Sequence, residues 1–330
     1  MSRAAQPSRR RASPEPAITP VTNAPITATA ADPLVMRIGE LRRLRRAVIL
    51  AHNYQPGEIQ DIADFTGDSF ELSRQAARTD AEVIVFCGVR FMAETAAVLS
   101  PEKTVLHPEP RAGCPLADMI TAEELRALKA AHRGDPVVAY VNTSAEVKAE
   151  TDICCTSSNA ARVTEAAAGP EVIFVPDHNL GLWVQRHTQK RLLLWQGYCP
   201  THNKITAEDV ERALREHPGA EVIAHPECRP EVLDRAHQVL STSGMIRRAR
   251  ESPAQTILVA TEVGIIHRLK KEAPEKEFFP VSRHAICPNM KRITLEKVLW
   301  SLEDLSGQVE VPTEIAARAR RALARMLEIA

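Results

Sequence analysis

The chain has 330 residues, of which 44% are hydrophobic and 25% charged, a composition typical of a folded protein with a large core. Its 42 basic and 42 acidic side chains cancel, and only 4% of its residues are aromatic, so we expect neither nucleic acid nor a membrane as partner. No apolar run approaches the roughly 20 residues of a transmembrane helix, and seven cysteines without a secretory signal favour a reducing compartment, so we expect a cytoplasmic enzyme.

The start of the chain differs in composition from the rest. Residues 1–33 are rich in Ala, Pro, Ser, Thr and Arg and show no apolar periodicity, so we expect a disordered tail. An organelle transit peptide is the alternative, because the segment is rich in arginine and poor in acidic residues. A basic helix is predicted from Pro33 onward, where apolar side chains recur at helical spacing. These side chains are Leu34, Ile38, Leu41 and Leu44.

The remainder of the chain contains a threefold repeat, which is visible in its apolar, strand-like runs. Two sets of runs recur with identical spacing: the first begins at Val48, Val137 and Val222, and the second at Val83, Val172 and Ile257. A third set ends in cysteine, and each cysteine opens the pattern Cys-Pro-x4-Ile-Thr-x-Glu. These cysteines are Cys114, Cys199 and Cys287. The matching intervals indicate three copies of one unit.

Short apolar strands that alternate with helical segments predict parallel sheets with right-handed crossovers. Each unit is expected to contain three strands, and the threonine of each repeated pattern is a credible helix N-cap. These threonines are Thr121, Thr206 and Thr294. We therefore predict an α/β fold of three repeated αβα units with small parallel sheets, arranged about a pseudo-threefold axis with the active site at the centre. The expected divisions are 34–127 (unit 1, with the leading helix), 128–213 (unit 2), 214–311 (unit 3) and a C-terminal helix at 312–330.

Three cysteines at equivalent places point to a metal centre. Each is expected at a helix N-terminus, where the helix dipole lowers the pKa of a thiol. Three thiolates can hold an iron–sulfur cluster that leaves one iron without a protein ligand, or a zinc ion with a water in the fourth position. Three buried apolar thiols are the structural alternative. The other cysteines lack equivalents in the repeat, and we expect most of them to be structural: Cys87, Cys154, Cys155 and Cys228.

Three hydroxyl residues recur with nearly the same spacing as the repeat. They are Ser69, Ser157 and Thr242, and each is expected near the start of a helix, whose free N–H groups can hold an anion. Ordinary helix capping is the alternative interpretation. Because the three sites converge near the expected metal centre, they predict a pocket for carboxylates and phosphate.

Polar side chains follow the first strand of each unit, at the edge where parallel sheets bind ligands. They are His52, Tyr54, Tyr140, Asn142, His225 and Glu227. Glu227 is the best general acid or base of this set, and His202, which closely follows Cys199, can reach the same pocket. A lone histidine on an apolar strand is more often a core residue, but here several polar groups follow equivalent strands. An exposed iron acts as a Lewis acid, so dehydration of a small polyanion is the predicted reaction class.

At these residues the sequence resembles the quinolinate synthase family of de novo NAD biosynthesis, from about residue 36 to 328. Ten ordered motifs carry the resemblance. They are LAHNYQ at 50–55, DIADFTGDS at 61–69, CGVRFMAE at 87–94, GCPLADM at 113–119, AYVNTSAEVK at 139–148, PDHNLG at 176–181, CPTH at 199–202, HPEC at 225–228, TEVGIIHRLKK at 261–271 and CPNMK at 287–291.

The resemblance implies a transferase that forms a C–C bond by condensing iminoaspartate with dihydroxyacetone phosphate, giving quinolinate, phosphate and two waters. It implies a [4Fe-4S] cluster with one open iron, held by Cys114, Cys199 and Cys287, and a functional link to an oxidase or dehydrogenase that supplies iminoaspartate. The substrate-binding residues that carry over are His52, Ser69, Tyr140, Asn142, Ser157, His225, Glu227 and Thr242. The catalytic candidates are Glu227, Tyr54, Tyr140 and His202.

Two other functions remain as alternatives. A diphthamide-type radical S-adenosylmethionine enzyme also builds a three-cysteine cluster site from related α/β units, but the HPEC, LAHNYQ and PDHNLG motifs disfavour it. A non-enzymatic cluster-based sensor needs no constellation of His, Tyr and Glu, and it usually carries a basic nucleic-acid-binding element. The sequence predicts the synthase over both.

Overall fold

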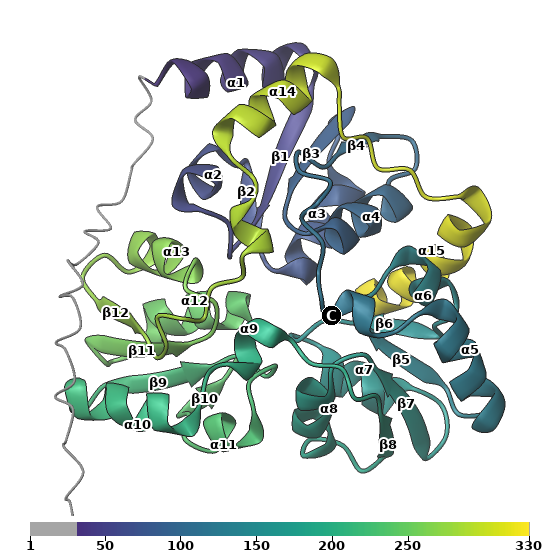
Figure 1. Cartoon of the computed structure of the whole chain (residues 1–330), viewed down its shortest axis with the longest axis vertical. Coiled ribbons are helices and arrows are strands. Elements are labelled where there is room, and N and C mark those ends of the chain that lie inside the picture. The colour runs from purple at the N-terminus through teal and green to yellow at the C-terminus, as the bar shows by residue number, and fades with distance from the viewer. Residues whose placement is uncertain (1–31, 330) are drawn as a thin grey trace, which may run out of the picture.

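The computed structural model describes residues 32–329, so the predicted tail lies outside it except for Asp32 and Pro33 (Figure 1). Helix α1 (Pro33–Leu44) begins at the predicted place because the Asp32 carboxylate accepts the N–H of Leu34 at 2.8 Å and caps the first turn. Ile38 and Leu41 are buried as predicted, whereas Leu44 at the end of the helix is 75% exposed.

The described chain contains three parallel sheets of four strands each, which occupy three sectors of the molecule (Figure 1). Their strand orders are the same: β2-β1-β3-β4, β6-β5-β7-β8 and β10-β9-β11-β12. The strands are β1 (Ala47–His52), β2 (Phe65–Gly67), β3 (Val83–Cys87), β4 (Thr104–Leu106), β5 (Val137–Tyr140), β6 (Ile153–Cys155), β7 (Glu171–Val175), β8 (Arg191–Leu194), β9 (Glu221–Ala224), β10 (Gln238–Val239), β11 (Thr256–Ala260) and β12 (Glu277–Pro280).

Helices connect the strands and cover the sheets. After α1 they are α2 (Gly57–Ile62), α3 (Ser69–Arg78), α4 (Arg90–Leu99), α5 (Ala122–Ala131), α6 (Ala145–Ala149), α7 (Ala160–Ala166), α8 (His178–Gln185), α9 (Pro200–Asn203), α10 (Ala207–Glu216), α11 (Pro230–Leu233), α12 (Thr242–Glu251), α13 (Ile265–Glu272), α14 (Leu295–Asp304) and α15 (Thr313–Glu328), with short 3-10 turns η1 (Ala117–Met119) and η2 (Asn289–Lys291).

The pairing register of the two central strands repeats from sheet to sheet. The valines that begin the first set of runs, Val48, Val137 and Val222, each pair with the second residue of the matching run in the second set. These pairs are Val48↔Ile84, Val137↔Ile173 and Val222↔Leu258. The α/β class and the three repeated units are therefore confirmed down to the register of single residues.

The prediction of three strands per unit is wrong, because each sheet has a fourth strand at its edge. The missed strands β2, β6 and β10 are two or three residues long. They are too short to show an alternating apolar pattern, and they form only because the long neighbouring strand offers a ready row of backbone donors and acceptors.

The helix that follows each cysteine packs on the sheet of another unit: the next unit for the first two cysteines, and the first unit for the third. Leu125 of α5 packs with the β5 strand, Val210 of α10 with β9, and Val298 of α14 with β1 of the first sheet. The last unit thus covers the first, beside α1, as the top of Figure 1 shows. The boundaries drawn at 127/128 and 213/214 remain predictions, and they fall within α5 and α10.

The predicted N-caps of these three helices are confirmed. Thr121, Thr206 and Thr294 each cap the helix that follows, and the first two form capping boxes with Glu124 and Asp209. The final helix, α15, packs against α6, β6 and α4. It therefore ties the end of the chain to the second unit as well as to the first.

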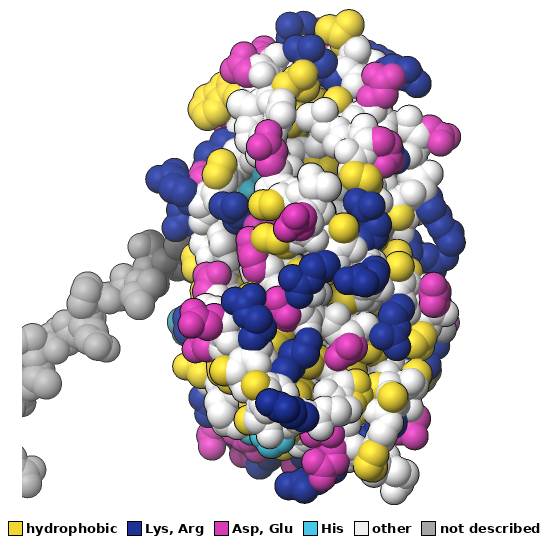
Figure 2. Space-filling model, turned by 90° about the vertical axis from the view of Figure 1, so that its right-hand side faces the viewer, with side chains coloured by type: hydrophobic (Ala, Val, Ile, Leu, Met, Phe, Trp, Pro, Cys, Tyr) yellow, Lys and Arg dark blue, Asp and Glu magenta, His cyan; other side chains and the backbone are white. Residues whose placement is uncertain are grey.

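The surface carries both signs of charge. On the face shown in Figure 2, Lys and Arg side chains are interspersed with Asp and Glu side chains, as a net charge of zero leads one to expect. Among the described residues, no helix is both long enough and apolar enough to cross a membrane.

Candidate active site

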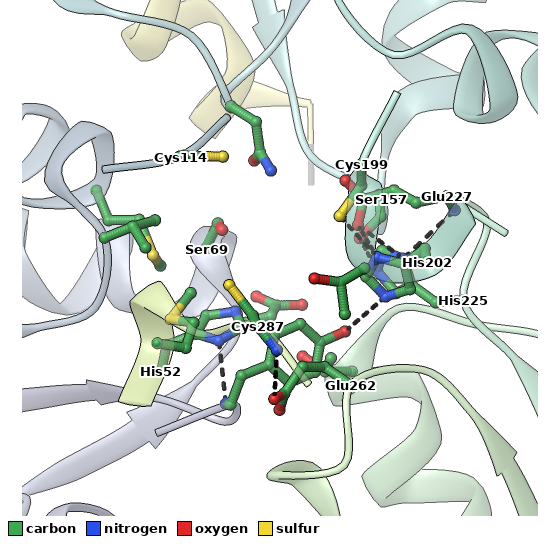
Figure 3. A pocket seen from close by; sticks show the side chains of 18 of the residues that line it. His52, Ser69, Cys114, Ser157, Cys199, His202, His225, Glu227, Glu262 and Cys287 are labelled. Atoms are coloured by element: carbon green, nitrogen blue, oxygen red, sulfur yellow. Dashed lines mark hydrogen bonds and ion pairs between the residues drawn. The ribbon is translucent and has the colours of Figure 1, made fainter. Parts of the chain in front are cut away.

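One pocket at the centre of the molecule brings all thirteen predicted site residues together (Figure 3). Its empty volume, counted together with the solvent-filled space at its mouth, is about 680 Å³. The predicted residues that line it are His52, Tyr54, Ser69, Cys114, Tyr140, Asn142, Ser157, Cys199, His202, His225, Glu227, Thr242 and Cys287. Their proximity is a finding of the structure, whereas the role of each remains a prediction. The other four cysteines are buried elsewhere, in or beside β3, β6 and β9.

The three hydroxyl residues have different positions relative to their helices. Ser69 and Thr242 are the first residues of α3 and α12, whereas Ser157 lies two residues before the N-cap of α7. The capping role falls to Asp68 for α3 and to Ser241 for α12. The alternative that Ser69 and Thr242 are the N-caps is therefore wrong, and both hydroxyls can face the pocket. Asn53 supports one of them, because its Nδ2 donates to Thr242 Oγ1 at 2.8 Å.

The three cysteines enter the pocket from loops that lead into very short helical turns. Cys199 is the N-cap of the four-residue α9, and Cys114 and Cys287 precede η1 and η2. Burial raises the pKa of the Cys114 thiol to about 12, and it also raises the pKa values of Cys199 and Cys287. The predicted lowering by a helix dipole is therefore wrong: one turn of helix is too short to outweigh desolvation. The thiolates need positive charge at the centre, which a bound metal supplies.

Two buried carboxylates hold the backbone of two of these cysteines. Asp177 Oδ2 accepts the N–H of Cys199 at 3.2 Å, and Glu262 Oε1 accepts the N–H of Cys287 at 3.0 Å. Both side chains are fully buried. Asp177 also caps α8 through Leu180 N, and burial, followed by the nearby Glu227, raises the pKa of Asp177 well above its usual value.

Glu262 belongs to a tight cluster at the edge of the pocket. Its Oε2 accepts the N–H of Gly264 at 2.7 Å, and the Lys291 ammonium pairs with the carboxylate at 2.9 Å while also donating to Tyr54 O. A Cβ at position 264 would lie 2.6 to 2.8 Å from Lys291 Nζ, Tyr54 O and Glu262 Oε2. Glycine at 264 is what lets these groups approach one another.

A chain of hydrogen bonds joins the acid and base candidates. His202 Nδ1 lies 3.0 Å from Glu227 Oε2 and 3.2 Å from Cys199 Sγ, and its Nε2 lies 2.7 Å from Thr261 Oγ1. Thr261 Oγ1 in turn lies 2.5 Å from the Tyr54 hydroxyl. On the other side of Glu227, His225 Nδ1 lies 3.2 Å from Oε2.

The charges of this network follow from its burial. Burial alone raises the pKa of Glu227, but the His202 and His225 imidazoles outweigh it and hold the pKa below its usual value, so the group is a carboxylate. Burial, followed by the Glu227 charge, raises the pKa values of Tyr54 and Tyr140 well above 10, so both phenols stay protonated. The site therefore offers Glu227 as a buried base and two protonated phenols as proton donors.

His52 is a neutral hydrogen-bond donor. Its Nδ1 accepts the N–H of Tyr54 at 3.1 Å, which leaves the proton on Nε2. Burial, together with the neighbouring His225, lowers the pKa of His52 from 6.5 to about 3, so the ring carries no charge near neutral pH.

Two acceptor atoms that line the pocket lack a partner within the described chain. They are Asn142 Oδ1 and Glu227 Oε1, both buried. An unsatisfied buried acceptor costs about 1–3 kcal/mol, and a bound ligand with N–H or O–H groups removes that cost. The pocket is thus shaped to receive a polar ligand.

Sequence reasoning missed Asp177 and Glu262, although the repeat contains a signal for them. They stand at equivalent positions of the second and third units, where the first unit has Gly88. Because the first unit has no carboxylate there, Asp177 and Glu262 are not among the features that all three units share. Thr261 and Lys291 were missed because only their contacts across units reveal them.

Comparison with known proteins agrees with this geometry. A family profile described as "Quinolinate synthetase A protein" matches residues 36–328. A protein of Dehalococcoides mccartyi strain CBDB1 named "Quinolinate synthase" is 57% identical over 293 residues, which cover 89% of this chain and 97% of the relative. Proteins of the same name from Methanoregula boonei and Thermodesulfovibrio yellowstonii are 55% and 52% identical, covering 88% and 89% of this chain and 96% and 98% of the relatives.

The family profile extends over nearly all of the described residues and includes all thirteen predicted site residues of the pocket. The matches favour the synthase over the radical enzyme and the cluster-based sensor. The chain therefore belongs to the quinolinate synthetase A family.

Proposed function

We propose that this chain condenses iminoaspartate with dihydroxyacetone phosphate to give quinolinate, phosphate and two waters. The observation that carries the proposal is the convergence of all thirteen predicted site residues in one pocket, in a chain 57% identical to a protein named quinolinate synthase. Both substrates are small anions, and the pocket offers hydroxyl, imidazole and phenol donors around a buried carboxylate.

Cys114, Cys199 and Cys287 would hold a [4Fe-4S] cluster. The donor set fits this group: three thiols at equivalent positions of the repeat line one pocket, and no fourth cysteine is among its lining residues. When bound, such a cluster supplies one iron without a protein ligand, a Lewis acid that assists loss of water. The three cysteines come from three different units, which supports a pseudo-threefold arrangement of those units around the site.

The hydroxyls and the neutral imidazole bind the anionic groups of the substrates. Ser69 and Thr242 are the first residues of ten-residue helices, where the positive end of the helix dipole favours phosphate or carboxylate. Ser157, held at 3.2 Å from His225 Nε2, contributes a third hydroxyl. His52 donates its Nε2–H without adding a positive charge. Asn142 Oδ1 accepts from an N–H or O–H group of the substrate.

Glu227 is the base that removes protons from carbon as the ring forms. Its Oε1 has no partner in the described chain, so one oxygen is available to the substrate while Oε2 is held by His202 and His225. Tyr140 and Tyr54 are protonated and return protons to the departing oxygen atoms. His202 connects Glu227 through Thr261 to Tyr54, which links the base to one of the two proton donors.

The cellular setting follows from the chemistry. All seven cysteines are unpaired thiols, which supports a reducing compartment, and we place the chain in the cytoplasm. Iminoaspartate is the oxidised form of an amino acid, so an amino-acid oxidase or dehydrogenase must supply it.

The test is quinolinate formation by the full chain, purified without oxygen and loaded with iron and sulfide, when given dihydroxyacetone phosphate and freshly generated iminoaspartate. We expect catalytic turnover that requires both substrates. Protein with full iron content that forms no quinolinate would leave the cluster assignment intact and overturn the substrate assignment. Release of one phosphate per quinolinate is the independent check on stoichiometry.

A further inference from the structure

The pocket contains a second donor set, different from the three thiols. Cys199 Sγ, His202 Nδ1 and a carboxylate oxygen of Glu227 all lie within 4.8 Å of one another. His202 Nδ1 is central, at 3.2 Å from Sγ and 3.0 Å from Oε2 (Figure 3). All three come from two adjacent loops, α9 with its N-cap and the loop after β9.

These separations match those around a tetrahedral cation. Metal–ligand distances of about 2.0 Å for nitrogen and oxygen and about 2.3 Å for sulfur place ligand atoms roughly 3.3–3.6 Å apart in a zinc tetrahedron. The Nδ1–Sγ and Nδ1–Oε2 separations of 3.2 and 3.0 Å are slightly shorter, so these two pairs need to move apart by only a few tenths of an ångström. One thiolate, one imidazole and one carboxylate are ligand types that Zn²⁺ and Co²⁺ accept, whereas Mg²⁺ and Ca²⁺ prefer oxygen alone.

The surroundings orient the imidazole for this role. His202 Nε2 lies 2.7 Å from Thr261 Oγ1, so in the tautomer that carries its proton on Nε2 the Nδ1 atom, beside Cys199 and Glu227, is the one able to bind a cation. Metal-binding histidines are commonly fixed in this way by a partner on the second ring nitrogen. Thr261 is fully buried and also bonded to the Tyr54 hydroxyl, so the orientation is rigid.

A second, independent observation points to a ligand at the same place. Glu227 is 3% exposed, and its Oε1 has no hydrogen-bond partner in the described chain. A cation bound through Oε1, or through both oxygens, balances the buried charge and gives Oε1 a partner.

We propose that, when the cluster is absent, Cys199, His202 and Glu227 bind one divalent cation of the zinc class, with the fourth position open to the pocket. The cation occupies one cluster ligand and the proposed base at once, so it blocks both cluster insertion and proton transfer. Wherever zinc is more abundant than iron, zinc bound at this site slows insertion of the cluster into the chain. The cation site itself goes beyond the proposed function and does not depend on it, whereas its effect on cluster insertion and proton transfer rests on the roles proposed there for Cys199 and Glu227.

The test is a titration of the full chain with Co²⁺ alone, after the iron has been removed by a chelator under anaerobic conditions. We expect one equivalent to bind, with a thiolate-to-cobalt absorption band in the near ultraviolet and the intense visible bands of a tetrahedral site. Added Zn²⁺ should abolish both sets of bands at one equivalent.

Variants distinguish this donor set from the three cysteines. His202→Ala and Glu227→Gln should each weaken Co²⁺ binding by at least about tenfold. The double variant C114A/C287A should bind as the wild type does, and so should His52→Gln, which changes another buried imidazole that lines the pocket. Circular dichroism of each variant establishes that it is folded, and Glu227→Gln serves where His202→Ala does not fold.

Three outcomes would overturn the proposal. Absence of tetrahedral Co²⁺ bands in the wild-type chain is the first. Loss of binding in C114A/C287A with retention in the His202 and Glu227 variants is the second, because it would assign the cation to the three thiols. The third is that the zinc-loaded chain takes up iron and sulfide as fast as the metal-free chain, which would show that bound zinc does not slow cluster insertion. None of these outcomes bears on whether the cluster-loaded chain makes quinolinate.

Discussion

The carboxylate of Glu262 accepts the backbone N–H of Cys287 at 3.0 Å, and both residues lie where the third unit meets the pocket. The second unit repeats the arrangement with Asp177 and Cys199 at 3.2 Å. Asp177 follows strand β7 and Glu262 follows strand β11, so each carboxylate is positioned by a sheet. Each carboxylate in turn holds the loop that carries the cysteine of its unit. A cluster ligand on a loop is thereby fixed to a rigid element.

Glu262→Gln should reduce iron content and stability together. The amide replaces one acceptor oxygen with an N–H₂ group, so either Cys287 N–H or Gly264 N–H loses its partner, and Lys291 loses its counter-charge. We expect the free energy of unfolding to fall by about 1–3 kcal/mol and iron per chain to fall severalfold after reconstitution. Chemical denaturation and iron analysis measure the two effects.

Glu303→Gln is the matched control, because Glu303 lies on the surface and pairs only loosely with Arg37 at 3.9 Å. It should keep wild-type stability and iron content. If Glu262→Gln behaved like this control, the carboxylate would have no part in holding the ligand loop.

Replacing any one of Cys114, Cys199 and Cys287 with Ala should abolish iron binding as a cluster and quinolinate formation together. The reason is that a cluster with only two thiolate ligands is not retained in a pocket that offers no other cysteine. Iron and sulfide analysis with visible absorption of the anaerobic protein measures the loss. Cys154→Ala is the control: this thiol is buried in β6, so the variant should lose some stability but keep its iron. A single-cysteine variant with both cluster and turnover would refute the ligand assignment.

The sequence was sufficient for the central strands and the cysteines, which repeat in all three units, but not for the short edge strands. The matched spacing of the apolar runs predicted the central strands, and the same spacing appears in the pairs Val48↔Ile84 and Val137↔Ile173. The equivalent cysteines predicted the pocket correctly, because residues at equivalent ends of equivalent strands meet where the units meet.

Features that depend on only one or two units, or on tertiary packing, could not be predicted in this way. The edge strand β10 has two residues and no pattern of its own. Glu262 has a counterpart in Asp177 but only Gly88 in the first unit. The thiol pKa values moved opposite to the expected direction, because desolvation depends on how much protein surrounds Cys114 and not on its place at the start of a helix.

Glu227→Gln should retain the cluster and lose turnover. The carboxylate is charged in the folded protein because His202 and His225 lower its pKa, and an amide of the same shape cannot take up a proton. We expect kcat to fall by about 10²- to 10⁴-fold with iron content unchanged, measured by quinolinate formation and iron analysis. Normal turnover would show that another group is the base. Loss of iron as well as turnover would mean that Glu227 acts through the cluster site rather than on the substrate.

The buried imidazole of His52 should make the protein less stable as the pH falls below neutral. The pKa of His52 is lowered from 6.5 to about 3 by burial and by His225, so between these values the unfolded chain binds a proton that the folded chain does not. The free energy of unfolding therefore decreases as the pH falls through this window, with His52 contributing up to about 1.4 kcal/mol per pH unit.

His52→Gln removes this contribution while it keeps a polar group at the end of β1. Between pH 6.5 and pH 5, the free energy of unfolding of this variant should fall less steeply than that of the wild type, by up to about 1.4 kcal/mol per pH unit. Urea denaturation of the metal-free chain at several pH values provides the slopes. His187→Gln changes an exposed imidazole and should keep the wild-type slope. Equal slopes for wild type and His52→Gln would mean that the His52 ring is protonated in the folded protein, and His52 would then bind anionic substrate as a cation rather than as a neutral donor.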